Sequence, residues 1–411
     1  MAHSVTPRAQ TGAMDWLPIA LDVDVSTRPM TVTAAGVPLV VVRPEPDAAP
    51  VVFADRCPHR LVPLSAATVE NGRLRCAYHG WEFDASGACV TLPSQEGAPP
   101  PRASLPKGPR VRVRDGVVEI SDLPDNDPTD LFTNEDPSLL HAWHPVGIVG
   151  QDEMSEVQLL GRTYRPSEER TRERWGLLWL APAEPRVELF DDPDHDDANY
   201  VGAWLETARS NAPAGVVADN FLDVAHFPFV HAKTFGAAEE KLVERYEVTD
   251  EPWGCRSVQD QWFDNPEDPG VAAGIRPIRQ RRRATYVYRA PFQLMLRLEE
   301  LDAGAVKTIL FFARPESLSS TRIYTKMLFH GIGGVADPAP EVIRSEVAFE
   351  EAVLAEDLEL QRTQRLPGLP LRMRDELHVR ADLLGVHMRR ILAKFHTGQS
   401  PAAALGGQAG D

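Results

Sequence analysis

The sequence predicts an α+β protein, in which a small all-β domain precedes a larger domain of long strands and helices. Short apolar runs broken by turn residues fill residues 16–122; the run 111–113, for example, is followed by Asp115-Gly116 and a second run at 117–120. After residue 196, several long strands precede two helices. Strands followed by helices favour a domain in which a helix lies in a curved antiparallel sheet.

Each element of the larger domain has its own signal in the sequence. Runs rich in aromatic and β-branched residues predict strands at 286–288, 292–298, 307–313 and 323–329. Apolar residues at helical spacing predict closing helices over 340–365 and 374–395. The polar, proline-bearing segment 123–128 has no periodicity and predicts a linker, with a domain boundary near residue 125.

Charge and composition exclude several classes of protein. The chain has 43 Lys and Arg against 60 Asp and Glu, a net charge of −17, which repels phosphate backbones and anionic membrane surfaces. No stretch approaches the ~20 apolar residues of a membrane helix, and residues 1–15 lack the apolar core of a signal peptide. We therefore expect a cytoplasmic protein with no nucleic-acid partner and no membrane partner.

Two short segments combine cysteine with histidine. Cys57-Pro58-His59 and Cys76-Ala77-Tyr78-His79 are separated by sixteen residues. In a Rieske [2Fe–2S] cluster two cysteines hold one iron and two histidines hold the other, so this ligand set predicts an electron-transfer cluster. The competing interpretation is a Cys57–Cys76 disulfide beside incidental histidines, but the chain otherwise looks intracellular. Cys89 and Cys255 are then expected to be buried thiols, and no disulfide framework is implied.

The residues around these ligands resemble the Rieske domain of a ring-hydroxylating oxygenase. The similarity extends through Arg60, Pro63-Leu64-Ser65, Gly80-Trp81, Phe83-Asp84, Gly87 and Pro93-Ser94-Gln95. It implies a Rieske domain over 14–125, with the cluster bound by Cys57, His59, Cys76 and His79.

The segment 219–231 resembles the catalytic-iron motif of the same family. Iron(II) enzymes that activate dioxygen commonly bind the metal through two histidines and one carboxylate, and His226 and His231 would supply the imidazoles. On an ideal helix, residues five apart point about 140° away from each other. Pro228 is therefore expected to bend the helix between them. Without the family, core or surface histidines would be the more common explanation.

The carboxylate ligand must come from another segment, and the predicted helix 340–365 offers six acidic residues between 346 and 359. At about 100° per residue, Glu350 and Asp357 lie on the apolar stripe, with Glu346 at its edge. The remaining three are expected to be solvated; they are Glu351, Glu356 and Glu359. The resemblance favours Asp357 as the third ligand, and Glu350 remains the alternative.

Two further residues near the histidines are predicted to belong to the catalytic site. Asp223, three residues before His226, resembles the aspartate that joins the mononuclear iron to the Rieske histidine of a neighbouring subunit, here His79. The alternative is an aspartate on a solvated helix face. Asn220 follows Asp219 where the family often has Glu-Asn, a departure that concerns only support of the ligands. Four aromatic residues are pocket or core candidates: Phe227, Phe229, Tyr288 and Phe292.

The resemblance also sets expectations for the remaining segments. Residues 131–195 resemble a shortened Rieske scaffold without ligands and would form a connector, although chance similarity of two short strands is an equal alternative. Residues 196–395 are expected to form a helix-grip, START-like catalytic domain containing the mononuclear iron, and 396–411 a flexible tail.

Taken together, the resemblance implies the catalytic alpha subunit of a Rieske non-haem iron oxygenase, acting as a homotrimer. Such an enzyme uses O2 to hydroxylate or oxidatively demethylate a small, aromatic or cyclic substrate. Because no nucleotide-binding motif is found, electrons are expected from a separate NAD(P)H-dependent reductase, with or without a ferredoxin. The arginines within 279–283 are either its docking site or a charged strand edge. The rival function is a Rieske electron carrier fused to a ligand-binding domain, without oxygen chemistry.

Overall fold

The structure is a computed structural model that describes residues 16–124, 128–236, 240–265, 268–335 and 338–399. Its contacts divide the chain into two compact units. The first contains Met1–Cys76, Trp81–Thr91 and Ala98–Asp127, and the second contains Ala77–Gly80, Leu92–Gly97 and Pro128–Asp411. The predicted fold class, an all-β domain followed by a domain of antiparallel sheet and helices, is confirmed.

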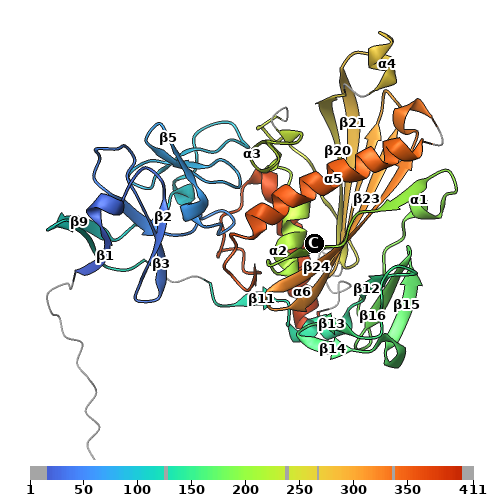
Figure 1. Cartoon of the computed structure of the whole chain (residues 1–411), viewed down its shortest axis with the longest axis horizontal. Coiled ribbons are helices and arrows are strands. Elements are labelled where there is room, and N and C mark those ends of the chain that lie inside the picture. Colours follow the sequence, from blue (N-terminus) through green and yellow to red (C-terminus); the bar gives the residue numbers. More distant parts are fainter. Residues whose placement is uncertain (1–15, 125–127, 237–239, 266–267, 336–337, 400–411) are drawn as a thin grey trace, which may run out of the picture. The chain divides into compact units, whose positions relative to one another are not determined.

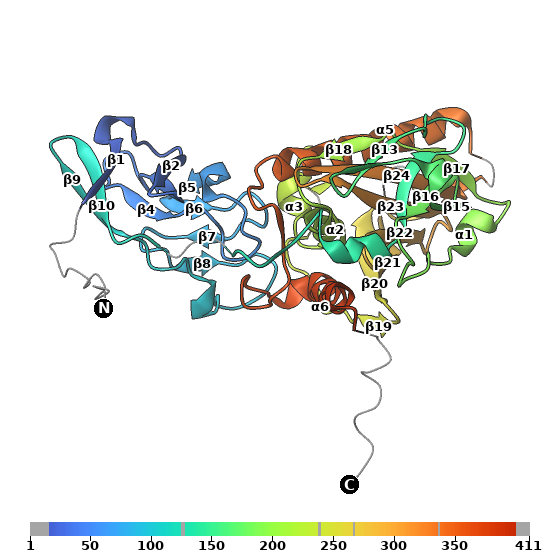
Figure 2. The same cartoon turned by 90° about the horizontal axis from the view of Figure 1, so that it is seen from below.

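In its described part, the first unit is built from strands and short turns (Figure 2). Its three antiparallel sheets have the strand orders β1-β10-β9, β2-β3-β4 and β5-β6-β7-β8. The strands are β1 Leu17–Leu21, β2 Met30–Ala34, β3 Val37–Val42, β4 Val51–Ala54, β5 Thr68–Glu70, β6 Arg73–Arg75, β7 Glu82–Phe83, β8 Cys89–Thr91, β9 Arg110–Arg114 and β10 Val117–Ser121. Asp115 and Gly116 both have positive φ, the conformation of the tight hairpin turn that the sequence predicted there.

The second unit is organised by one large antiparallel sheet of the order β17-β24-β23-β22-β21-β20-β19, with β18 also paired to β24. Its strands are β17 Val201–Trp204, β18 Ala208–Ser210, β19 Thr249–Glu251, β20 Gly254–Asp264, β21 Arg279–Arg289, β22 Gln293–Glu300, β23 Val306–Ser317 and β24 Ser320–His330. All four strands predicted for this domain lie in this sheet, three of them wholly within observed strands and the fourth one residue out, because β22 begins at Gln293.

Helices cover the sheet. Figures 1 and 2 show the long helix α5, Pro340–Gln361, running across its strands. The others are α1 Pro193–Asp196, α2 Ala214–Leu222, α3 Phe227–Val230, α4 Pro269–Ala272 and α6 Leu383–Thr397. The main core lies between the sheet and α2, α5 and α6; it contains Tyr286, Leu294, Phe311, Val217 and Phe395. Tyr288 and Phe292 belong to this core, so packing explains them.

The segment 131–195 contributes smaller strands to the second unit. The strands β12 His144–Ile148, β15 Arg170–Arg174 and β16 Leu177–Ala181 form a sheet of the order β12-β16-β15. The strands β13 Val157–Leu159 and β14 Arg162–Tyr164 pair with each other, and β11 Leu131–Thr133 pairs with β25 Gly368–Pro370. Trp179 of β16 packs edge-on against Phe312 of the large sheet.

Two expectations about elements are wrong. The last helix begins at Leu383 instead of residue 374, because residues before it form turns and a 3-10 segment, Arg380–Asp382. The arginine-rich strand β21 is not an edge strand, because it lies between β20 and β22. Its Arg281 and Arg283 both pair with Asp260 of β20, so these two guanidinium groups share one carboxylate.

Some predicted boundaries fall on residues that the structure does not describe: residues 14–15, 125–127 and 400–411. Of the predicted tail, His396 and Thr397 form the end of α6, which Gly398 terminates at φ 70°. No helix in the described ranges is long and apolar enough to cross a membrane.

Candidate metal centres

The two histidines of the 219–231 motif flank one short helical turn. Helix α2 ends at Leu222, with Asp223 as its C-terminal cap, and α3 occupies only Phe227–Val230. His226 precedes α3 and His231 follows it. The predicted single bent helix is therefore wrong: the chain leaves the helix between Asp223 and His226. Since His231 lies outside the helical turn, its ring is not held at the divergent angle of a continuous helix.

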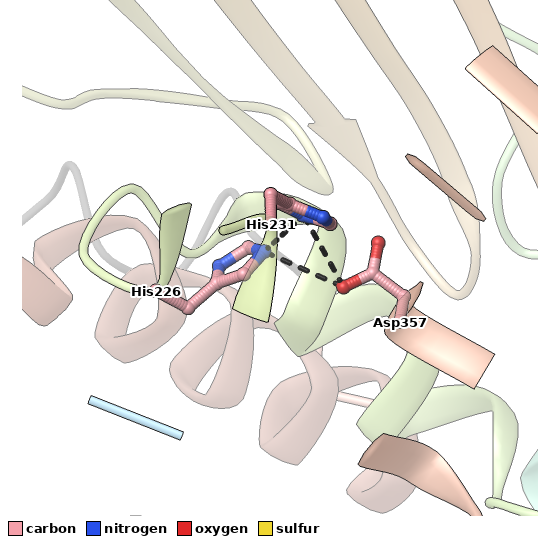
Figure 3. A group of neighbouring side chains, drawn as sticks. All are labelled: His226, His231 and Asp357. Atoms are coloured by element: carbon pink, nitrogen blue, oxygen red, sulfur yellow. Dashed lines mark hydrogen bonds and ion pairs between the residues drawn. The ribbon is translucent and has the colours of Figure 1, made fainter. Parts of the chain in front are cut away.

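These histidines meet one carboxylate of α5. His226 Nε2 lies 3.0 Å from His231 Nε2, and Asp357 Oδ1 lies 3.4 Å from the first and 3.5 Å from the second (Figure 3). Metal bonds of about 2.1 Å at right angles would separate neighbouring donors by about 3 Å. The three atoms thus fit one triangular face of an octahedron. Among the residues that the structure describes, His226, His231 and Asp357 form a group whose metal-binding atoms all lie within 4.8 Å of one another, close enough to hold one metal ion.

The electrostatics of this group favour a bound cation. Burial lowers the pKa of His226, but Asp223 and Asp357 outweigh it and raise that pKa to about 9. Burial is also the largest cause at His231, and there it lowers the pKa despite the opposing charges of Asp357 and Glu356. One imidazole therefore tends to hold a proton where a metal ion would replace it.

Asp223 lies between His226 and His79 within the second unit. Its Oδ2 is 2.7 Å from His79 Nε2, and its Oδ1 is 3.7 Å from His226 Nδ1. Burial opposes ionisation of Asp223, but the two imidazoles outweigh it and hold its pKa well below the usual range. The alternative of an aspartate on a solvated helix face is excluded, because Asp223 is only 7% exposed.

The loop that carries His79 requires glycine at its next position. Gly80 has φ +64°, and a Cβ atom there would lie 2.2 Å from the Phe229 ring of α3. Any larger residue would push the loop away from α3.

A hydrogen-bond chain orients Asp357 from behind. Asn220 Nδ2 donates to Asp357 Oδ1 at 3.1 Å and lies equally close to the Tyr78 hydroxyl. Gln361 Nε2 donates to Asn220 Oδ1 at 2.8 Å, and Ser210 donates to Gln361 Oε1 at 2.6 Å. Asn220 thus holds the Asp357 carboxylate by its side-chain amide. The supporting roles of Gln361 and Ser210 were not predicted from the sequence.

Glu356 is the acidic residue that sequence reasoning placed wrongly. Expected in solvent, it accepts a hydrogen bond from His231 Nδ1 at 3.1 Å and from the Thr234 hydroxyl at 2.7 Å. The Lys233 backbone also donates to it at 3.2 Å. A carboxylate on the free nitrogen of a metal-binding histidine fixes the ring and makes it a better ligand.

Asp219 belongs to a buried group of charges that joins three segments. Its carboxylate accepts hydrogen bonds from two nitrogens of the Arg389 guanidinium group on α6. The third nitrogen, Arg389 Nε, lies 2.8 Å from Glu376 Oε2. Arg389 is completely buried. Because Asp219 directly precedes Asn220, this group fixes the turn of α2 that carries the amide beneath Asp357.

Three of the four predicted cluster ligands, Cys57, His59 and Cys76, lie in the first unit. Cys57 and Cys76 are buried, and their thiols interact with each other without a disulfide. Burial raises the pKa of the Cys57 thiol well above its usual value, so the thiolate needs a cation such as iron. The His59 ring stacks on Trp81 at a centroid distance of 4.5 Å. These donors fit the cysteine and histidine ligation of a Rieske cluster.

Comparison with known proteins identifies both regions. The family model of the Rieske [2Fe–2S] domain matches residues 15–107, and that of the vanillate O-demethylase oxygenase C-terminal domain matches residues 210–397. TsaM2 of Comamonas testosteroni, assigned as iron-sulfur subunit of a toluene-4-sulfonate monooxygenase system, is 44% identical over 296 residues, 71% of this chain and 66% of its own length.

Two further proteins are similar to this chain. The dicamba O-demethylase oxygenase component of Stenotrophomonas maltophilia is 39% identical over 105 residues, which is 26% of this chain and 30% of that protein. The solved NdmA mutant of Pseudomonas putida CBB5 with theobromine aligns with 93% of this chain and 90% of its own, at 19% identity and a TM-score of 0.45. The chain spans under two thirds of the length of each of the two curated relatives. Carrying both matched domains in one sequence, the chain belongs to the Rieske non-haem iron oxygenases.

Proposed function

We propose that the protein uses O2 and supplied electrons to hydroxylate or oxidatively demethylate a small aromatic or cyclic compound. The observation that carries this proposal is the convergence of His226, His231 and Asp357, with donor atoms 3.0–3.5 Å apart. A mononuclear iron bound there would supply dioxygen activation, and a [2Fe–2S] cluster on Cys57, His59, Cys76 and His79 would supply single electrons.

The protein's own residues have separate tasks in this proposal. Glu356 and Asn220 hold His231 and Asp357 in the orientations that the metal requires. Asp223 contacts the Rieske ligand His79 and lies beside His226, so its carboxylate connects the two sets of ligands. Its depressed pKa keeps it ionised, which lets it accept a hydrogen bond from His79 and attract the His226 ring, whose Nδ1 lies 3.7 Å away.

We also propose the partners and setting of the reaction. Electrons come from a separate NAD(P)H-dependent reductase, directly or through a ferredoxin, and the working form is a homotrimer in the cytoplasm, where cysteine ligands stay reduced. The arginines of β21 do not favour a docking role, since Arg281 and Arg283 are already paired with Asp260.

The rival, an electron carrier without oxygen chemistry, differs in its iron content. Iron analysis of the purified, iron-replete protein should approach three irons per chain for the oxygenase and two for the carrier. We expect His226→Ala to lose one iron and all substrate-dependent oxygen uptake with a surrogate reductase, while the visible absorption of the cluster stays unchanged. Loss of the cluster absorption in that variant, or a wild-type content of two irons, would contradict the proposal.

A further inference from the structure

One inward-facing carboxyl group on α5 has no role in holding the metal. At about 100° per residue, Glu350 lies within about 40° of Ile343 and Leu354 on the helix surface. Both of these residues pack against the core cluster under the sheet, with Ile309 and Met327. Glu350 therefore lies on the face of α5 that packs against the sheet.

Glu350 is unlike its neighbours in having no partner there. Glu346, one turn earlier, forms an ion pair with Lys307 of β23. Asp357, two turns later, accepts a hydrogen bond from the Asn220 side chain. No hydrogen bond or ion pair reaches the Glu350 carboxyl among the residues that the structure describes. The residue as a whole is partly buried.

The pKa of the Glu350 carboxyl reflects this unfavourable environment. Burial raises the pKa of Glu350 to about 7, with Asp357 and Glu346 acting in the same direction and Lys307 opposing them. An inward-facing carboxyl without a partner is unfavourable in a free protein. Such a group is characteristic of a site that a ligand completes.

We propose that Glu350 is a specificity-determining residue that binds a protonated amine, or another N–H or O–H donor, on the substrate. This inference rests on the proposed function and names the substrate class of that same site. Asp357 comes seven positions after Glu350, about 10 Å along the helix axis. The donor group therefore lies at the end of the ring compound remote from the carbon that is oxidised. Carboxylates and sulfonates at that end are disfavoured by like charge.

Two probes of nearly equal shape and opposite charge test the proposal: 4-methoxybenzylamine and 4-methoxybenzoate. Calorimetric titration of the iron-replete protein at pH 8, where Glu350 is ionised, should show the amine binding at least about tenfold more tightly, the value of one charged hydrogen bond. Glu350→Gln should abolish this preference. Glu359→Gln is the matched control, because Glu359 is exposed on the same helix and pairs with Arg362 at the surface.

A structural role for Glu350 predicts a different pattern. Removing a carboxyl that lacks a partner should leave the melting temperature unchanged or raise it, whereas removing a structural carboxyl should lower it. An unchanged probe preference in Glu350→Gln, tighter binding of the benzoate by the wild type, or binding of neither probe would each overturn the inference. These outcomes are separate from failure of the proposed function, which shows as two irons per chain and no oxygen uptake.

Discussion

At the residue scale, the metal group shows where single-residue reasoning succeeds and where it stops. The apolar stripe of α5 reduced six acidic residues to Glu350 and Asp357, and the structure brings Asp357 to the two histidines. The contact of Glu356 with His231 was not predicted, because a helical wheel considers only one packing partner of the helix, the sheet. Its carboxylate faces a second partner, the segment after α3 with Lys233 and Thr234. Nothing in local periodicity reveals a second packing surface.

The hydrogen-bond chain behind Asp357 was equally invisible in the sequence. Ser210, Gln361 and Asn220 come from β18, the end of α5 and α2. Neutral polar residues occur everywhere on protein surfaces, so their identity carries little information until the fold brings them together. The resemblance pointed to Asn220 only through its place in a motif.

Glu356 should matter for iron binding although it does not contact the metal position. We expect Glu356→Ala to weaken iron(II) affinity by about 10- to 100-fold, because the His231 ring loses the acceptor that fixes its Nδ1. Glu356→Gln should lose less, since its amide oxygen can still accept that hydrogen bond. Iron retained during dialysis against a graded chelator measures the effect, with Glu359→Gln as the control. Equal retention in Glu356→Ala and wild type would contradict the role.

At the element scale, the break between α2 and α3 was predicted at the wrong residue. Pro228 was expected to bend a helix, but it sits in the first turn of α3, where proline is well tolerated. The helix ends earlier because Asp223 accepts a hydrogen bond from the Ala225 backbone at 2.8 Å. A short aspartate side chain that captures nearby backbone N–H groups competes with the helix. The same residue thus ends α2 and contacts His79.

Strand β12 of the connector contains a buried histidine that makes stability depend on pH. His144 donates from Nε2 to the Leu139 carbonyl at 2.8 Å. Burial lowers its pKa to about 4, the charge of Arg314 acts in the same direction, and the hydrogen bond opposes both. Between that value and the ordinary 6.5, the unfolded chain binds a proton that the folded chain does not. The free energy of unfolding is therefore not reduced by His144 above pH 6.5, and it falls as the pH drops toward 4.

Replacing this histidine should remove part of the acid sensitivity. At pH 5.5 the proton bound only by the unfolded chain costs about 1.4 kcal/mol relative to pH 8. His144→Gln keeps a donor for Leu139 but does not titrate. The loss of unfolding midpoint in urea between pH 8 and pH 5.5 should be smaller in His144→Gln than in the wild type. An identical loss in both proteins would show that His144 is not the source.

At the scale of the whole molecule, the sequence analysis and the structure differ in which chain supplies the His79 that Asp223 contacts. The resemblance implied that Asp223 contacts His79 of a neighbouring subunit, whereas the single chain has its own His79 at 2.7 Å from Asp223. Exchange of an identical segment between protomers reproduces the same contact between subunits. The proposed homotrimer therefore keeps this contact and changes only which chain supplies His79.

Mixing two inactive variants distinguishes these arrangements. Cys57→Ser removes a cluster ligand and His231→Ala removes an iron ligand, so each homogeneous protein should be inactive with a surrogate reductase. If His79 of one subunit serves Asp223 of the next, co-expressed mixed trimers should recover about a quarter of the wild-type oxygen uptake, since each working site needs one chain of each kind in the correct order. Mixing the separately purified proteins without subunit exchange is the control. No recovery in mixed trimers of verified composition would mean that each chain uses its own His79, because only then are the intact cluster and the intact iron site never in contact.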